Sequence, residues 1–196
     1  DETRNGSDIT VIQISDDEGK NWRTVEVPES TGRVHINIIE MKNGYLVGLM
    51  RSRFADNIYR TVSNDYGETW SKPIRTELPN NNSSISAIKL QSGKIALVYN
   101  PTRYNEDQSQ TVWPQQRCPV ELAVSEDEGI TWPYRRVVEH GEGFEGRLND
   151  INNKRYEYPV MIQARDGKIH ISYSWKYEIY LYRRKLDIGR RNMRWR

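Results

Sequence analysis

The side chains of this chain that are best suited to chemistry are arginines, joined by one histidine and two tyrosines. They are Arg51, Arg53, Arg103, Arg117, His35, Tyr156 and Tyr158. A guanidinium group presents a planar fork of N–H donors that can hold a carboxylate through two parallel hydrogen bonds. An arginine-rich set of this kind predicts a site for an acidic ligand, provided that the fold brings these distant residues together.

The elements that would position these side chains are marked by an eight-residue phrase that occurs three times. Its copies are SDDEGKNW at 15–22, SNDYGETW at 63–70 and SEDEGITW at 125–132. Ser and Asp side chains can bond backbone amides within a tight turn, Gly supplies a positive φ, and Trp gives the hairpin a large group to pack. The phrase therefore predicts a structural turn, with its Asp accepting turn hydrogen bonds and its Trp buried beside it.

A second repeat alternates with the first. Asn43-Gly44, Ser92-Gly93 and Asp166-Gly167 each lie between two apolar runs. A two-residue turn of this composition between apolar runs is the signature of a short β-hairpin. The chain thus alternates between two kinds of hairpin, and no segment shows the periodicity of a helix.

This alternation predicts an all-β propeller whose blades have four antiparallel strands. The Gly hairpin joins strands one and two of each blade, and the eight-residue turn joins strands three and four. We expect the outer half of one blade at 8–30, complete blades at 34–78 and 85–139, the inner half of another at 157–183, and a basic tail at 184–196. Half-blades leave unpaired strand edges, so we expect the rest of a longer protein or a partner chain to complete the ring.

Strand connectivity also predicts on which face of the propeller the candidate site residues lie. If both kinds of hairpin lie on one face, the remaining connections lie on the other and converge near the propeller axis. This places the four arginines, His35 and the two tyrosines on one face, together with Asn37 and the polar loop from Asn80 through Asn82 to Ser84.

The eight-residue phrase resembles the Asp box, S-x-D-x-G-x-T-W, of the sialidase (neuraminidase) superfamily of β-propellers. Two copies match fully, and the first differs in having Asn21 where the family has Thr. The resemblance covers residues 9 to 182 and implies a six-bladed ring, of which this chain holds about three blades. It also implies a glycoside hydrolase that acts on a terminal acidic sugar.

Active sialidases use three arginines on the substrate carboxylate, a Tyr nucleophile with a Glu partner, and an Asp acid/base. By resemblance, Arg51 is similar to the second of these arginines, Arg117 to the third, and Tyr158 to the nucleophile. The first arginine and the Asp belong to earlier blades of the family, which this sequence does not contain. Arg53, Arg103 and Asn82 are further candidates for contact with the substrate.

One residue departs from the family pattern, because the Glu partner of the Tyr falls at His35. A phenol, with an ordinary pKa of about 10, needs a base to become a nucleophile at neutral pH. A neutral imidazole, with an ordinary pKa of about 6.5, can serve as that base. We therefore expect Tyr158 and His35 to be the catalytic pair.

Two other functions use the same residue types. A polysaccharide lyase acting on uronate glycans would use His as the base, Arg to neutralise the carboxylate, and Tyr to protonate the leaving oxygen. A non-catalytic propeller would bind glycan or serve as a structural subunit of a larger assembly. The sequence leaves these alternatives open.

Composition further limits the cofactors and partners that we expect for this chain. The chain has 196 residues, one cysteine and three histidines, and the histidines lack the spacing of a zinc site, so we expect no metal or other cofactor. No apolar stretch is long enough to span a membrane. Residues 183–196 carry seven basic side chains against Asp187 and could contact an acidic partner. The compartment is not fixed by the sequence, which is compatible with a secreted or extracytoplasmic location.

Overall fold

The computed structural model describes residues 6–104, 111, 117–140, 156–175 and 178–184, and these form β-strands without any helix. The predicted all-β fold is confirmed. Apart from Arg184, the predicted basic tail lies outside the described residues. The strands are β1 (Val11–Ile14), β2 (Arg23–Glu26), β3 (Arg33–Lys42), β4 (Tyr45–Ser52), β5 (Asn57–Ser63), β6 (Ile74–Pro79), β7 (Ser86–Lys89), β8 (Ile95–Tyr99), β9 (Val120–Ser125), β10 (Tyr134–Glu139), β11 (Glu157–Gln163), β12 (Ile169–Trp175) and β13 (Glu178–Arg184).

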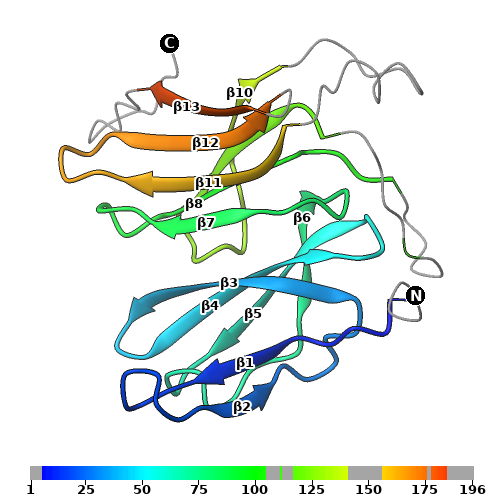
Figure 1. Ribbon diagram of the computed structural model, residues 1–196, viewed down its shortest axis with the longest axis vertical. Helices are drawn as coiled ribbons and strands as arrows, with labels where there is room; N and C mark the ends of the chain where they lie inside the picture. The colour runs from blue at the N-terminus through cyan, green and yellow to red at the C-terminus, as the bar shows by residue number, and fades with distance from the viewer. Residues whose placement is uncertain (1–5, 105–110, 112–116, 141–155, 176–177, 185–196) are drawn as a thin grey trace.

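These strands form antiparallel sheets that follow one another along the chain (Figure 1). The sheets are β1-β2, β3-β4-β5-β6, β7-β8-β9-β10 and β11-β12-β13. Hairpins join β3 to β4 at Gly44, β7 to β8 at Gly93 and β11 to β12 at Gly167, as the sequence predicts. The first strands of the three larger sheets lie side by side, with β7 in contact with both β3 and β11. This is the arrangement of consecutive propeller blades around an axis.

The three eight-residue turns share one hydrogen-bond pattern. In the second copy, the Ser63 hydroxyl accepts from the Gly67 amide at 2.8 Å and donates to the Asp65 carboxylate at 2.7 Å. The same carboxylate oxygen accepts from the Thr69 backbone N–H at 2.9 Å, and the other oxygen accepts from the Thr69 hydroxyl at 2.6 Å. Two successive left-handed residues, Tyr66 at φ 60° and Gly67 at φ 93°, close the turn. The prediction that the Asp of each turn accepts turn hydrogen bonds is confirmed.

The first copy keeps this pattern despite its different residue at the Thr position. The Asn21 backbone N–H and side-chain amide both donate to Asp17, at 2.8 and 2.6 Å. An amide N–H therefore replaces the hydroxyl donor of the other copies. The substitution changes the donor and leaves the turn intact.

The expectation that all three Trp side chains are buried is wrong for one of them. Trp70 is 7% exposed and Trp132 is 1% exposed, whereas Trp22 is 60% exposed. Trp70 packs in the core between the β1-β2 sheet and the next sheet, and Trp132 packs between the two four-stranded sheets. Each indole is thus covered by the sheet that precedes its own, and no described residues cover the corresponding side of the β1-β2 sheet.

The core is divided among the spaces between sheets. Ile12, Met50 and Tyr59 pack between the first two sheets. Leu49, Leu97 and Tyr99 belong to the core between the two four-stranded sheets, and a third core joins the β7–β10 sheet to β11 and β12. Because each sheet is apolar on both faces, the sheets stack as blades and their strand ends are left to form the two outer faces.

The Asp-box carboxylates make the fold sensitive to acid. Hydrogen bonds from the Thr69 side chain, the Thr69 backbone and Ser63 lower the pKa of Asp65 from 3.8 to about 2. A carboxylate whose pKa is lowered on folding stabilises the fold above its unfolded pKa, and this contribution is lost as the pH falls through the folded value. We expect the thermal midpoint of the wild type to fall between about pH 4 and pH 2, and Asp65→Asn to have a lower midpoint at neutral pH but a flatter dependence in that window.

Calorimetry across that pH range tests this expectation. Asp166→Asn is the control, because the Asp166 pKa is lowered first by the Lys168 side chain and then by the Lys168 backbone amide, and Asp166 lies outside the Asp boxes. An Asp65→Asn variant with the same slope as the wild type would contradict the assignment.

Candidate functional site

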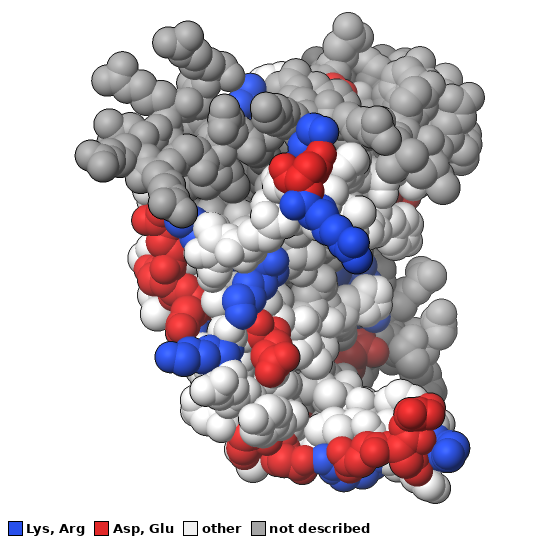
Figure 2. Space-filling view, turned by 90° about the vertical axis from the view of Figure 1, so that its left-hand side faces the viewer, with Lys and Arg blue, Asp and Glu red and all other residues white. Residues whose placement is uncertain are grey.

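The positions of the turns identify one of the two faces formed by the strand ends. The Tyr66 amide of the second Asp box donates to the Gly44 carbonyl at 3.0 Å, and Lys94 beside the Gly93 hairpin forms an ion pair with Glu126 of the third box. Both kinds of hairpin therefore lie on one face, which is the left side of Figure 1. Figure 2 looks onto this face, where acidic and basic side chains alternate without a field of one sign.

Arg51 lies on the other face, at the strand ends opposite the hairpins. It is the penultimate residue of β4, pairs with Val34 of β3, and is 7% exposed. Its Nε has no hydrogen-bond partner among the described residues. Burial, followed by the charges of Arg53 and Arg117, lowers the pKa of Arg51 to about 10, while Tyr158 and Asp8 act in the opposite direction.

These electrostatic neighbours show that the structure gathers residues from four segments of the chain. Asp8 precedes β1, Arg51 and Arg53 lie at the end of β4 and just after it, Arg117 precedes β9, and Tyr158 lies in β11. The cluster has an excess of positive charge and a buried guanidinium with an unused donor. Such an arrangement is suited to binding an anion.

Asp8 is a member of this cluster that sequence reasoning missed. Its carboxylate lies 3.0 Å from Nε of Arg53, and both side chains are largely buried. The Arg53 amide also donates to the Gly32 carbonyl at 2.8 Å, which fixes the backbone beside the pair. No repeat or spacing marked Asp8, because it precedes the first strand and meets Arg53 only through tertiary contact.

Arg117 and Arg103 are placed differently. The Arg117 side chain is 14% exposed, with Nε 3.7 Å from Glu157, and its charge acts on Arg51. Arg103 is exposed and is not among the charges that shift the pKa of Arg51 or His35. The structure therefore brings Arg117 into the cluster with Arg51.

His35 and Tyr158 occupy equivalent positions of the repeat. Each lies nine residues before the hairpin glycine of its sheet, and each has a left-handed backbone, at φ 52° and φ 51°. Each also lies in a register shift of its first strand, between Val34 and Asn37 in β3 and between Glu157 and Val160 in β11. A non-glycine residue in this conformation is strained, and a bulge changes the direction of a side chain. The same device thus presents both side chains, and Tyr158 is 63% exposed.

The environment of His35 keeps its imidazole neutral. Burial, then the charges of Arg51 and Arg53, lower its pKa below the ordinary 6.5. A neutral imidazole has a lone pair with which it can accept a proton. No hydrogen bond joins His35 directly to Tyr158, although both lie within the electrostatic reach of Arg51.

Asn82 belongs to a buried polar loop beside these residues. It is fully buried and left-handed, with φ 58°. The Asn80 side-chain oxygen accepts from the Asn82 amide at 3.0 Å and from the Ser52 amide at 3.1 Å. The loop therefore fastens the end of β4, next to Arg51, and the Asn82 side chain has no exposed surface.

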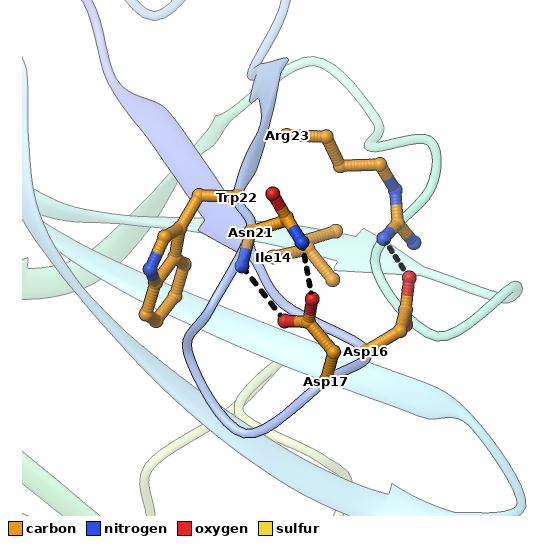
Figure 3. A pocket seen from close by; sticks show the side chains of 6 residues that line it. All are labelled: Ile14, Asp16, Asp17, Asn21, Trp22 and Arg23. Carbon is orange, nitrogen blue, oxygen red and sulfur yellow. Dashed lines mark hydrogen bonds and ion pairs between the residues drawn. The ribbon is translucent and has the colours of Figure 1, made fainter.

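A cavity of about 220 Å³ lies on the other face, at the first Asp box (Figure 3). Its lining residues are Ile14, Asp16, Asp17, Asn21, Trp22 and Arg23. Asp17 is occupied by Asn21 and Asp16 by Arg23, so the polar groups of this cavity satisfy one another. Among the described residues, no group of His, Cys, Asp and Glu could hold a metal, and no helix is long and apolar enough to cross a membrane.

Sheets stacked as blades, Asp-box turns on one face and an arginine cluster on the other define a β-propeller of the sialidase superfamily. The model of the BNR repeat-like domain matches residues 2–171, and the chain belongs to that family. The predicted relationship is thereby confirmed. A comparison with curated proteins finds no match.

Solved structures share the fold at low sequence identity. The NanB sialidase from Streptococcus pneumoniae is 20% identical with a TM-score of 0.65, over 90% of this chain and 26% of its own. The Hadza microbial sialidase Hz136 is 18% identical with a TM-score of 0.65, over 88% of this chain and 31% of its own. The intramolecular trans-sialidase from Ruminococcus gnavus is 21% identical with a TM-score of 0.62, over 89% of this chain and 36% of its own. This chain thus spans about a quarter to a third of the length of these proteins.

The buried charge of Arg51 should lower the stability of the fold and the pKa of His35, and both effects can be measured. A buried guanidinium with an unpaired donor destabilises the fold, so Arg51→Met should raise the thermal midpoint by about 2–4 °C, equivalent to about 1 kcal/mol for a protein of this size. Removing its charge should also raise the pKa of His35 toward 6.5, because Arg51 is one of the two charges that lower it.

NMR titration of the His35 ring and calorimetry measure these two effects. Arg103→Met serves as the control, since Arg103 does not act on His35 and should leave its titration unchanged. A His35 pKa that is the same in Arg51→Met and the wild type would show that the two side chains are not neighbours.

Proposed function

We propose that this chain carries part of a sialidase-like site that hydrolyses the glycosidic bond of a terminal acidic sugar. The observation that carries the proposal is the buried, unpaired Nε of Arg51 within a cluster of Arg53, Arg117, His35 and Tyr158. A carboxylate at this point would gain charge-assisted hydrogen bonds and relieve the repulsion among the arginines.

The arginines have distinct roles in this proposal. Arg51 and Arg117 hold the substrate carboxylate from two sides. Arg53 is paired with Asp8, so it contributes less to binding. A neutral phenol is a suitable nucleophile beside this carboxylate, because a carboxylate nucleophile would be repelled by the substrate's own charge.

Tyr158 and His35 perform the chemistry. The Tyr158 oxygen attacks the anomeric carbon while His35 takes the phenolic proton, and the bond to the leaving oxygen breaks as that oxygen takes a proton from the acid supplied by the other sheets. Water then attacks the anomeric carbon and gives a proton back to that acid, the bond to Tyr158 breaks, and His35 returns its proton to the Tyr158 oxygen. Because the pKa of His35 is lowered, the imidazole remains a proton acceptor to a pH below the ordinary value for histidine.

The lowered pKa of His35 also favours a second candidate, a lyase acting on a uronate glycan. There His35 removes the proton beside the carboxylate, the bond to the leaving oxygen breaks, and Tyr158 protonates that oxygen. The product contains a carbon–carbon double bond conjugated to the carboxylate and absorbs in the near ultraviolet. The product therefore distinguishes the two reactions.

The site is completed by further propeller sheets, supplied by a longer chain or a partner chain. Two observations support this. The outer faces of the arc expose apolar side chains, with Val11 45% and Ile162 59% exposed. The related structures are also about 2.5 to 3.5 times as long. A contiguous exposed apolar face on a sheet marks a surface that another sheet can cover.

Arg51→Lys tests the carboxylate clamp. An ammonium keeps the charge but cannot reproduce the planar two-point grip, so we expect the KM for a fluorogenic α-sialoside to rise at least about tenfold, equivalent to about 1.4 kcal/mol. Steady-state kinetics of the intact protein make the measurement, with Arg165→Lys as an exposed control. An unchanged KM and kcat would remove Arg51 from the site.

Tyr158→Phe tests the reaction. The variant should lose turnover by about a thousandfold or more and still bind the sugar, because the ring remains and only the reacting oxygen is gone. Activity should be assayed in parallel on a sialoside and, by ultraviolet absorbance, on a uronate polysaccharide. Release of the sialoside reporter supports the hydrolase, an absorbing product supports the lyase, and binding without either product supports a non-catalytic glycan-binding propeller.

A further inference from the structure

Asn100 occupies the position in the second four-stranded sheet that is equivalent to Arg51 in the first. It follows β8 directly and is seven residues beyond the hairpin glycine Gly93, as Arg51 is seven residues beyond Gly44. The β3–β6 sheet thus places a guanidinium at this position, and the β7–β10 sheet places a neutral amide that is fully buried. The amide faces protein instead of ligand.

The amide nitrogen of Asn100 meets three backbone carbonyl oxygens. It donates to Arg117 at 2.8 Å, to Pro119 at 3.0 Å and to Tyr156 at 3.3 Å. Arg117 and Pro119 belong to the segment that enters β9, and Tyr156 to the segment that enters β11. The Tyr156 amide also donates to the Arg117 carbonyl at 3.2 Å. One side chain therefore joins the two segments that carry Arg117 and Tyr158.

The three carbonyl oxygens around this nitrogen require a hydrogen-bond donor. Three carbonyl oxygens that converge on one point repel one another unless hydrogens lie between them, and an amide NH₂ supplies two. The Asn100 side-chain oxygen is buried without a hydrogen-bond partner among the described residues. Leaving that acceptor unpaired carries a desolvation cost, so the three contacts on the nitrogen account for the orientation of the side chain.

We propose that Asn100 is a positioning residue that fixes Arg117 and Tyr158 relative to each other. The inference rests on the proposed function, since it assigns to these two side chains the carboxylate grip and the attack on the same sugar. Tyr158 is only two residues from Tyr156, across the bulge of β11. A shift of either segment changes the separation of the binding group from the reacting group.

Asn57 provides a matched control for a purely structural role. It is also buried, its nitrogen donates to the Thr76 carbonyl at 2.9 Å, and its oxygen accepts from Arg75 at 2.7 Å. It links β5 to β6 and touches neither segment of the site. Asn57→Ala should lower stability, as Asn100→Ala does, without changing the geometry of Arg117 and Tyr158.

Two measurements on the intact protein test the proposal. Amide hydrogen exchange at Tyr156 reports the link between the segments without requiring activity, and we expect Asn100→Ala to speed it at least about tenfold and Asn57→Ala to leave it unchanged. The kcat/KM for a fluorogenic α-sialoside should fall by about 10–100-fold in Asn100→Ala, because small misplacements of reacting groups have effects of this size. Asn100→Ser, which keeps one donor, should lie between Asn100→Ala and the wild type and replaces it if the alanine variant does not fold.

The outcomes separate the two proposals. Unchanged Tyr156 exchange in Asn100→Ala, or an equal fall of kcat/KM in Asn57→Ala, would overturn the positioning role. Faster Tyr156 exchange in a protein whose wild type neither binds nor cleaves the sialoside would refute the proposed function while showing that Asn100 joins the segments.

Discussion

The fold depends on the hydrogen bonds that one aspartate carboxylate accepts within its own turn. In each Asp box, the carboxylate is held by a serine hydroxyl and in turn holds the backbone and side chain three to four positions beyond it. The serine also accepts from the glycine amide, which allows two left-handed residues in succession. Because this turn is satisfied locally, it forms in the same way in each sheet and directs both adjoining strands. The opposite strand ends are then free to carry chemistry.

The candidate site shows how a repeat acquires different functions at equivalent positions. His35 and Tyr158 share a bulge and a left-handed backbone, and Arg51 and Asn100 share the end of the second strand of a sheet. The backbone supplies the direction, and the residue type decides whether the group faces a ligand or fastens a neighbour. Two of the buried asparagines, Asn80 and Asn100, secure the segments beside Arg51 and Arg117. Buried amides that carry no charge thus hold the segments that bear these side chains.

Electrostatics explains why this end of the molecule is suited to an anion. Three arginines lie together, and of these Arg53 pairs with Asp8 and Arg117 lies 3.7 Å from Glu157, whereas Arg51 has no ion pair among the described residues. Desolvation, followed by the charges of Arg51 and Arg53, lowers the pKa of His35, and Arg53 also acts on Arg51. A bound carboxylate would relieve the repulsion among the arginines, so stability and binding are opposed at this position. The hairpin face, with its paired charges, has no such excess.

The sequence by itself determined the turns, the alternation of hairpins and therefore the stacked antiparallel sheets, because those features depend on residues within eight positions of one another. It also marked Arg51, His35 and Tyr158, since strand connectivity decides which end of a sheet a residue reaches. Only the tertiary structure decided that Asp8 meets Arg53, that Asn82 is buried, that Arg117 joins the cluster, and that Trp22 is exposed while Trp70 is covered. Each of these depends on how one sheet packs against the next, and the spacing of residues within a strand contains no record of that contact.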